Sequence, residues 1–319
     1  MKKLLDRIFI DGLGGMAQGL FATLIIGTII QQIGLFMGGG TGDLIYELGK
    51  IAAGLTGAGI GVGVARKLEA GHLVIVSAAV VGMIGAFAGK ILSGQVLVDG
   101  NLVLAGPGEP LGAFAAAYLA IEIGILISGK TKLDIILTPL VCIGTGSAVG
   151  LFVGPPISEF MLWLGSLINW GTEQQPFLMG IVVSVLMGMI LTLPISSAAL
   201  GVILNLSGLA AGAATIGCCC NMIGFAVASW RENKFSGFLA QGIGTSMLQI
   251  PNIVRRPLIW LPVILSSAVL GPIGTMLLHM TNNATGSGMG TAGLVGPLMT
   301  WQVMTQSEAG CLLYTSPSP

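Results

Sequence analysis

The sequence is dominated by long runs of apolar residues that carry few or no charges. The run from 258 to 280 is one of them, and it is long enough to cross a lipid bilayer, which takes about 20 residues of α-helix. Only 8% of the residues are charged and 54% are hydrophobic, whereas an ordinary soluble domain has about 25% charged residues. A water-exposed surface cannot be made from this composition. The runs therefore predict an all-α polytopic membrane protein.

The apolar runs are continuous, whereas a transmembrane β-barrel alternates apolar and polar residues in strands of about 10 residues. We expect about 8–10 transmembrane or re-entrant helical segments. The candidates are residues 15–36, 51–65, 72–92, 111–127, 135–153, 177–193, 198–211, 213–230, 238–250 and 258–280. Three of these fall short of a full crossing and are rich in glycine, which predicts broken or re-entrant helices. They are residues 51–65, 198–211 and 238–250.

Three connecting segments have patterns of their own. Residues 1–11 are short, basic and amphipathic, which predicts an interfacial helix leading into the first span. Residues 155–171 have apolar side chains at helical spacing and two tryptophans, which predicts an amphipathic helix lying at the outer interface. Residues 96–110 contain Asp-Gly and Pro-Gly turn signals and predict a small hairpin.

Residues 1–310 are expected to form a single transmembrane domain, because no stretch has the composition of a separate soluble domain. Residues 311–319 differ in composition from the rest and resemble a translated sequencing adapter. We expect this tail to be non-native and the natural C terminus to be missing.

Basic residues fall at alternate connections between the spans, and this predicts a cytoplasmic N terminus. They are Lys2, Lys3, Arg7, Arg66, Lys67, Lys130, Lys132, Arg231, Lys234, Arg255 and Arg256. The pairs around 231 and 255 both require the cytoplasmic side, with only residues 238–250 between them. A hairpin that enters from the cytoplasm satisfies both. The formal net charge of zero argues against nucleic acid as a partner.

Residues 281–297 follow an apolar run but are rich in glycine, asparagine and threonine. Glycine and asparagine disfavour a regular helix. The stretch is therefore either a surface loop or irregular backbone at membrane depth, which must be buried in protein or line a wet cavity. We favour the second interpretation. Asn282 and Asn283 are then candidate ligand-binding residues, and two further breaks, residues 194–205 and 241–252, are expected to lie near them.

Glu122 stands alone inside a predicted span. An ionisable group at membrane depth is costly and is a candidate for function by default. It either accepts hydrogen bonds from a ligand or carries a proton, or it is a structural carboxylate that is paired or wetted near a helix end. No acidic cluster, HExxH or GxxxxGK[ST] motif is present, and three of the five cysteines are contiguous. We therefore expect no metal, no cofactor and no catalytic residue in this chain.

The remaining candidates lie at the other breaks. Pro194 followed by Ser196 and Ser197 suits a helix break that exposes hydroxyls to a cavity, or a tight turn with a serine cap. Asn205 follows in the same short segment and either binds a ligand or bonds a neighbouring helix. The amides of Gln249 and Asn252 could bind sugar hydroxyls. The arginines after them either receive a phosphoryl group or anchor the chain at the interface.

Three motifs give the chain a resemblance to a known family. They are T-L-P-I-S-S-A-A-L at 192–200, Q-I-P-N-I-V-R-R-P at 249–257 and G-S-G-M-G-T-A-G-L-V-G-P at 286–297. Together with the glycine-rich ten-segment layout, over residues 1–305, they resemble the membrane subunit, enzyme IIC, of bacterial sugar phosphotransferase systems. The similarity is to the divergent group that includes perfringolysin regulator-type membrane proteins. The G-I-T-E motif of glucose-type subunits is absent, so their substrate-binding glutamate is not transferred.

The resemblance implies a multi-pass protein of the bacterial plasma membrane that takes up a sugar or polyol. Its expected partners are the lipid bilayer and a second copy of the chain in a homodimer. Phosphorylation would need separate IIB and IIA proteins, with IIB at the cytoplasmic face, because no such domain is attached. Two alternatives stay open. One is a membrane regulator or sensor that no longer transports, and the other is a proton-linked secondary transporter of a small organic solute.

Overall fold

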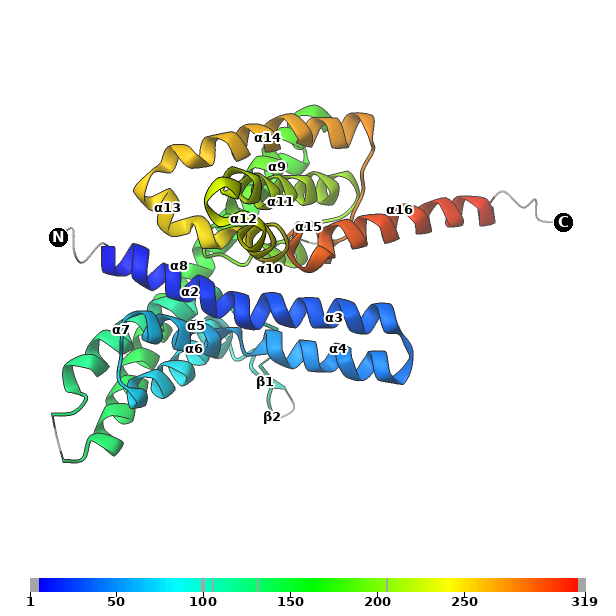
Figure 1. The fold of residues 1–319 in the computed structure, drawn as a ribbon. Helices are drawn as coiled ribbons and strands as arrows, with labels where there is room; N and C mark the ends of the chain where they lie inside the picture. The colour runs from blue at the N-terminus through cyan, green and yellow to red at the C-terminus, as the bar shows by residue number, and fades with distance from the viewer. Residues whose placement is uncertain (1–5, 99–100, 105, 131, 205, 315–319) are drawn as a thin grey trace. The chain divides into compact units, whose positions relative to one another are not determined.

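The computed structural model describes residues 6–98, 101–104, 106–130, 132–204 and 206–314, and these residues are overwhelmingly helical (Figure 1). The chain divides into two compact units. Unit 1 comprises Met1–Leu162 and Met247–Pro257, and unit 2 comprises Trp163–Ser246 and Leu258–Pro319.

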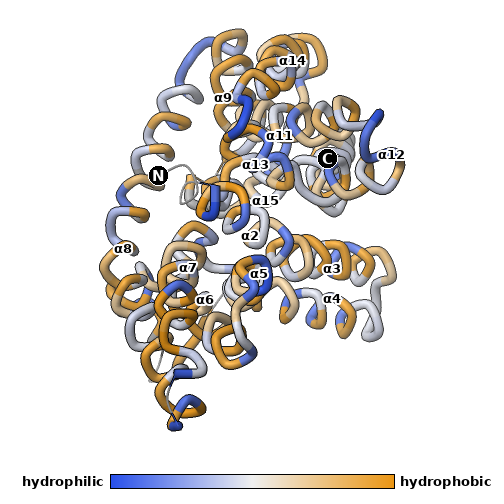
Figure 2. The backbone as a smooth tube through the Cα atoms, turned by 60° about the vertical axis from the view of Figure 1, so that its left-hand side comes forward, coloured by the Kyte–Doolittle hydropathy of each residue, from blue (hydrophilic) through white to orange (hydrophobic). Residues whose placement is uncertain are grey.

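Six helices in the described part of the chain are long and apolar enough to cross a membrane. They are Arg7–Met37, His72–Leu92, Pro110–Ile127, Asp134–Thr172, Gly208–Ala228 and Pro257–Leu277. A seventh results if Gly39–Gly54 and Thr56–Lys67, which meet at 50°, form one broken span. Hydrophobic residues predominate along these helices in Figure 2. The predicted class, an all-α polytopic membrane protein with broken helices, is confirmed.

Unit 1 begins with one long helical run rather than with a separate interfacial helix. It consists of η1 (Arg7–Gly12), α2 (Leu13–Leu20), η2 (Phe21–Ile25) and α3 (Ile26–Met37). The helix predicted to lead into the first span is therefore continuous with it from Arg7 onward, its interfacial position stays a prediction, and residues 1–5 lie outside the described part. Nothing between Asp11 and Leu13 breaks helical geometry, since Gly12 itself is helical, so the apolar run and the basic segment join into one helix.

Helix α4 (Gly39–Gly54) runs antiparallel beside α3 (Figure 1), in a region where the sequence analysis placed no helix. Glycines allow the two backbones to approach closely. A Cβ added at Gly34 would lie 2.5 Å from the backbone nitrogen of Tyr46, and one at Gly27 would lie 2.6 Å from that of Ala53. This is small-residue packing of the kind found between membrane helices. The glycines of α3 and α4 are therefore the contact surface between the two helices.

The core of unit 1 is formed by α5 (Thr56–Lys67), α6 (His72–Leu92) and α7 (Pro110–Ile127), packed together and against α2. The predicted spans 72–92 and 111–127 agree with α6 and α7 to within one residue. Strands β1 (Leu97–Val98) and β2 (Asn101–Leu102) pair antiparallel, with Leu97 opposite Leu102, which confirms the predicted hairpin. Helix α13 (Ile250–Arg255) packs on η1 and α2.

Helix α8 (Asp134–Thr172) is 39 residues long and contains Pro139, Pro155 and Pro156. The sequence analysis divided this region into a span at 135–153 and a separate interfacial helix at 155–171, and the division is wrong. Proline removes one backbone donor and crowds the preceding turn. In membrane helices this disturbance is tolerated by local adjustment. The paired prolines therefore lie inside the helix instead of ending it.

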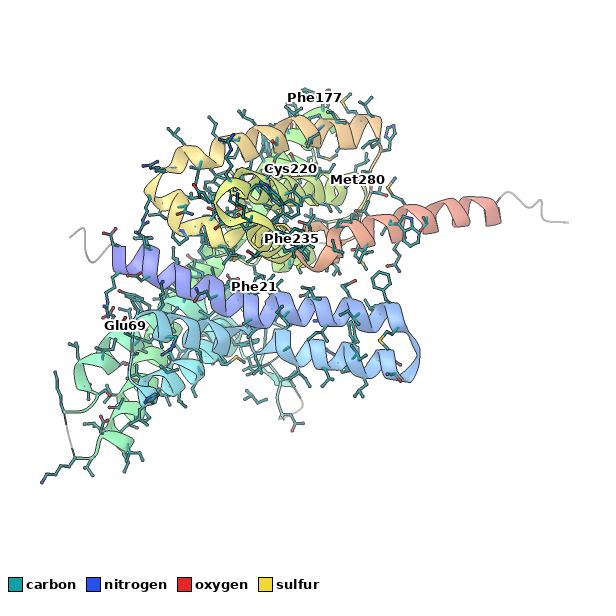
Figure 3. The ribbon with its side chains drawn as sticks, in the orientation of Figure 1. Phe21, Glu69, Phe177, Cys220, Phe235 and Met280 are labelled. Carbon is teal, nitrogen blue, oxygen red and sulfur yellow. The ribbon has the colours of Figure 1, made fainter. Side chains whose placement is uncertain are left out.

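The core of unit 2 consists of three helices, α9 (Pro176–Thr192), α11 (Gly208–Ala228) and α14 (Leu261–Pro272), which pack against one another (Figure 1). Helix α14 is preceded by η5 (Pro257–Trp260) and continued by η6 (Ile273–Leu277). Cys218 and Cys220 are buried on α11, and Cys220 lies among the packed side chains of this unit in Figure 3. Both cysteines are packed as small core residues.

Short and irregular elements surround this core. They are α10 (Ser197–Ile203), α12 (Trp230–Leu239), η3 (Ala240–Gly244), η4 (Ser246–Gln249), α15 (Ala284–Ser287), η7 (Ala292–Leu294) and α16 (Val295–Tyr314). The predicted segment 238–250 is broken, since Thr245 is extended between η3 and η4. Whether it is re-entrant stays a prediction. Of the expected non-native tail, 311–314 continue α16, and 315–319 lie outside the described residues.

The break between the predicted segments 198–211 and 213–230 lies earlier than expected. Helix α10 ends at Ile203 and α11 starts at Gly208, whose φ of 57° is in the left-handed region that glycine tolerates. Gly212, which the sequence analysis took as the boundary, is inside α11. A Cβ there would meet the carbonyl of Met280, so this glycine serves close packing and not a turn.

Candidate functional site

Residues 281–297 are irregular backbone buried in unit 2, as favoured from the sequence. They contain only the four-residue α15 and the three-residue η7 before α16 begins. Asn282 is 1% exposed and Ser287 is completely buried. The segment begins directly after Met280, which Figure 3 labels. The alternative of a surface loop is therefore excluded.

Asn282 ties this segment to helices on both sides. Its Nδ2 lies 2.7 Å from Oγ1 of Thr215 on α11, 2.9 Å from Oγ1 of Thr300 and 3.2 Å from the Gly296 carbonyl on α16. Its Oδ1 accepts a hydrogen bond of 2.8 Å from the backbone N–H of Asn283. The amide is thus saturated by protein groups, and in this conformation Asn282 positions the backbone of the segment.

Asn283 has a more open environment. Its Oδ1 accepts a 2.9 Å hydrogen bond from the Gly286 N–H and so caps α15. Among the described residues, its side-chain nitrogen has one hydrogen-bond acceptor, the thioether sulfur of Met299 at 3.7 Å. A thioether is a weak acceptor. The half-buried Asn283 amide group is therefore better suited than that of Asn282 to donate to a ligand.

The serine break lies against the same segment. The Ser197 hydroxyl donates a 2.6 Å hydrogen bond to the carbonyl of Gly288, and Ser196 and Ser197 are both buried. A Cβ at Gly288 would meet the Ser197 carbonyl, so the two backbones touch. Of the residues predicted for the site, Ser196, Ser197, Asn282 and Asn283 are thus gathered around α10 and α15. Asn205, the fifth on this side, lies outside the described residues.

A second polar network lies in the core of unit 2 and is centred on Asn221, which is fully buried on α11. The Asn221 amide donates to the Gly217 carbonyl at 3.1 Å and to the Ser267 hydroxyl at 3.2 Å. Its oxygen accepts from the indole N–H of Trp260 at 3.2 Å and from the Thr192 hydroxyl at 3.4 Å. Asn221 therefore bonds residues of neighbouring helices in the core of unit 2.

This network connects chain breaks. Thr192 is the last residue of α9, and its hydroxyl lies 3.0 Å from that of Ser246, which follows the extended Thr245. Trp260 ends the short η5 segment just before α14. Sequence reasoning missed Thr192, Ser246 and Trp260. The available signal was that each is a polar or amphipathic residue at the edge of an apolar run.

Unit 1 holds the other predicted site residues. Nε of Arg7 donates to Oε1 of Glu122 at 2.6 Å, and Nη2 donates to Oε2 at 3.3 Å. Both side chains stay partly open, at 39% and 30% exposure. Glu122 is therefore paired, as the structural alternative required, and a ligand role for it stays a prediction. Arg7 was interpreted only as an interfacial charge, and its partner could not be found without knowing that η1 packs on α7.

Gln249 and Asn252 also belong to unit 1. The Asn252 amide donates to Oε1 of Gln249 at 2.9 Å, with Gln249 buried and Asn252 exposed. Their helix, α13, packs on η1 and α2, the same helical run that begins with Arg7. The predicted residues therefore form two groups, one within each unit. The first is Glu122, Gln249 and Asn252, and the second is Ser196, Ser197, Asn282 and Asn283.

The described residues contain no group of three or more His, Cys, Asp or Glu side chains that could hold a metal ion. The polar groups gathered at the breaks are instead amides, hydroxyls and backbone carbonyls, with one ion pair. Such groups recognise ligands through hydrogen bonds to neutral donors and acceptors.

Multiple apolar helices, several of them broken, with polar residues buried at the breaks, define a multi-pass membrane protein of the transporter type. The chain matches the family Phosphotransferase system, EIIC over residues 10–315. It therefore belongs to this family and is a membrane subunit of a phosphotransferase-system transporter, working with other components of that system. No curated protein matches the chain.

Proposed function

We propose that the protein translocates a sugar or polyol, which a separate IIB protein phosphorylates at the cytoplasmic face after IIA has supplied the phosphoryl group. The observation that carries this proposal is the contact between the two polar breaks in unit 2, made by the Ser197 hydroxyl and the Gly288 carbonyl. It gathers hydroxyls, amides and irregular backbone in a part of the protein that is otherwise apolar. Transporters build substrate sites from broken helices of this kind.

The charge of these segments supports a neutral substrate. Residues 192–217 and 281–303, which contain both breaks and the helices that hold them, include no Asp, Glu, Lys, Arg or His. No side chain in these segments therefore offers a cation to an organic anion. Hydroxylated neutral molecules need only the amides and hydroxyls that are present. This argues against the secondary transport of an organic anion.

The Arg7–Glu122 contact supports a cytoplasmic N terminus. Arg7 starts the first span, and Glu122 lies five residues before Ile127, the end of α7. The contact therefore brings the start of one span beside the end of another. The connection after α7 carries Lys130 and Lys132, so basic residues collect at one end of unit 1, which the positive-inside rule assigns to the cytoplasm. We extend the proposal to a bacterial plasma membrane and to a homodimer.

The first test is stabilisation of the purified wild-type protein by sugars and polyols, for example D-glucose, D-fructose, N-acetyl-D-glucosamine and D-mannitol. A ligand present at 100 times its Kd should raise the free energy of unfolding by about 2.7 kcal/mol. The second test is uptake into proteoliposomes, with and without purified IIB, IIA and a phosphoryl donor. The proposal expects a sugar that both stabilises the protein and accumulates as its phosphate only when the phosphocarriers are present.

The alternatives give different results. Accumulation driven by a pH gradient without phosphocarriers would indicate a proton-linked transporter, and Glu122→Gln should then abolish it. A protein that responds to no sugar and transports none, but whose deletion changes expression of a neighbouring gene, would be a regulator with this fold. Either result would contradict the proposed function.

A further inference from the structure

The hydroxyl of Tyr118 is buried and has no hydrogen-bond partner among the described residues. Tyr118 is 6% exposed and lies on α7. Water cannot readily reach a buried group inside a membrane span, so an unpaired hydroxyl there costs free energy and is normally avoided. An unpaired hydroxyl in this position indicates a partner that is not part of the protein.

The Tyr118 hydroxyl is directed at the Arg7–Glu122 pair. Tyr118 and Glu122 are four residues apart and therefore lie on the same face of α7. The hydroxyl is close enough to interact with both the Arg7 guanidinium and the Glu122 carboxylate. It nevertheless completes no hydrogen bond of good geometry with either one. The three groups thus face one another without closing the network.

Packing fixes the Tyr118 ring, so the hydroxyl cannot turn away to find another partner. The ring lies 5.8 Å from that of Phe114, centroid to centroid. Gly12 of η1 lies against both rings, since an added Cβ there would lie 3.3 Å from Cδ2 of Tyr118 and 3.1 Å from the Phe114 ring. The position of the hydroxyl is therefore set by the fold, as expected for a preorganised binding group.

The ion pair supplies the rest of a binding site. The Arg7 and Glu122 side chains are 39% and 30% exposed, so a ligand can reach groups that already hold each other. The carboxylate has lone pairs free beside the Arg7 contacts, and the tyrosine hydroxyl can both donate and accept. Arginine neutralises the carboxylate, so the arrangement favours an uncharged molecule with adjacent hydroxyl groups over an ion.

We propose that Tyr118 is a substrate-binding residue, and that its hydroxyl bonds one hydroxyl of a neutral sugar or polyol while the Glu122 carboxylate, held by Arg7, accepts from the next. This inference rests on the proposed function and adds to the polar breaks of unit 2 a separate group of substrate contacts in unit 1, formed by Tyr118, Glu122 and Arg7. In this arrangement Arg7 is a positioning residue, because it holds the Glu122 carboxylate in the orientation in which the substrate binds.

The test uses Tyr118→Phe, with Tyr46→Phe on α4 of the same unit as the matched control. The ligand is whichever of D-glucose, D-fructose, N-acetyl-D-glucosamine and D-mannitol stabilises the wild type most. Three quantities are measured for wild type and both variants: the melting temperature without ligand, the shift in melting temperature that the ligand causes, and the Kd of the ligand. Tyr118→Phe should melt no lower than wild type without ligand, because removal of an unpaired hydroxyl removes a cost. Its Kd should rise about fivefold to tenfold, the usual effect of one lost hydrogen bond. Tyr46→Phe should change none of the three quantities.

Two results would overturn the inference while the proposed function stands. In one, Tyr118→Phe binds the sugar as tightly as wild type. In the other, Tyr118→Phe melts well below wild type without ligand, which would mean that the hydroxyl has a structural partner. Failure of the proposed function is recognised separately, because then the wild-type protein itself responds to none of the four compounds, and the inference falls with it.

Discussion

Nε of Arg7 lies 2.6 Å from Oε1 of Glu122, although the two residues are 115 positions apart in the sequence. The contact fastens the first helical run to α7 within unit 1. Arg7→Ala or Glu122→Ala alone would leave one charge without its partner inside the apolar frame, which is more costly than removing both. We expect each single substitution to lower the free energy of unfolding by about 1–3 kcal/mol, and the double substitution to cost less than the sum, with a coupling of about 1–2 kcal/mol. A double-mutant cycle from unfolding titrations in mixed micelles measures this.

The Glu47–Lys50 pair on α4 is the matched control, because its Nζ–Oε1 distance is 3.4 Å and its side chains are 58% and 65% exposed. An exposed pair of this kind should show a coupling below about 0.5 kcal/mol. Equal coupling energies in the two cycles would mean that Arg7 and Glu122 behave as ordinary surface charges.

Ser197→Ala tests the contact between the two breaks of unit 2. The hydroxyl donates to the Gly288 carbonyl at 2.6 Å in a buried setting, so its loss leaves a buried acceptor unpaired. We expect a loss of about 1–3 kcal/mol in the free energy of unfolding, measured in the same micelle titration. Ser236→Ala, at an exposed serine that bonds only the Asn233 carbonyl three residues earlier, should change it by less than about 0.5 kcal/mol. A Ser197→Ala protein as stable as wild type would show that α10 and α15 are held by other contacts.

The sequence predicted best the elements whose pattern is uniform. The span 72–92 coincides with α6, because a long apolar run between Gly71 and Ser93 leaves few other possibilities. The irregular backbone of 281–297 was also predictable, since its glycines and asparagines oppose a helix and its position between apolar runs opposes a loop. In both cases the local sequence and the final packing favour the same structure.

The sequence was misleading where glycine and proline have more than one use. No segment was predicted over most of α4, whose glycines pack against α3, and Pro155 began a separate predicted helix but lies inside α8. The hydrogen-bond and ion-pair partners of polar residues could not be predicted from the sequence for another reason. Glu122 stood out as an ionisable residue in a span, but its pairing with Arg7 depends on which helices pack together, and this is a property of the whole fold and not of any window of sequence.

Asn221 is expected to be the polar residue whose loss most destabilises unit 2. Its amide uses both its donor and its acceptor capacity, and Asn221→Ala would leave the buried Ser267 hydroxyl, the Trp260 indole N–H and the Thr192 hydroxyl without this partner. We expect a loss of about 2–4 kcal/mol in the free energy of unfolding. Trp260→Phe removes a single donor and should cost less. Asn233→Ala, at an exposed position on α12, should stay within about 0.5 kcal/mol of wild type, and an equal effect at 221 and 233 would contradict the proposed importance of the network.

Gly217→Ala tests the close approach of α9 and α11. A methyl group at Gly217 would overlap the carbonyl of Ser184, and that backbone has little freedom to move, because the Ser184 hydroxyl donates to the Ser267 carbonyl at 2.7 Å. We expect a loss of about 2–3 kcal/mol in the free energy of unfolding, since overpacking forces two helices apart. Gly144→Ala on α8 is the matched control, because an added Cβ there meets nothing within 4 Å. The same change should be neutral or should stabilise by up to about 1 kcal/mol, since alanine loses less backbone entropy than glycine in a helix. Equal stabilisation of both variants would show that α9 and α11 do not approach each other closely at Gly217.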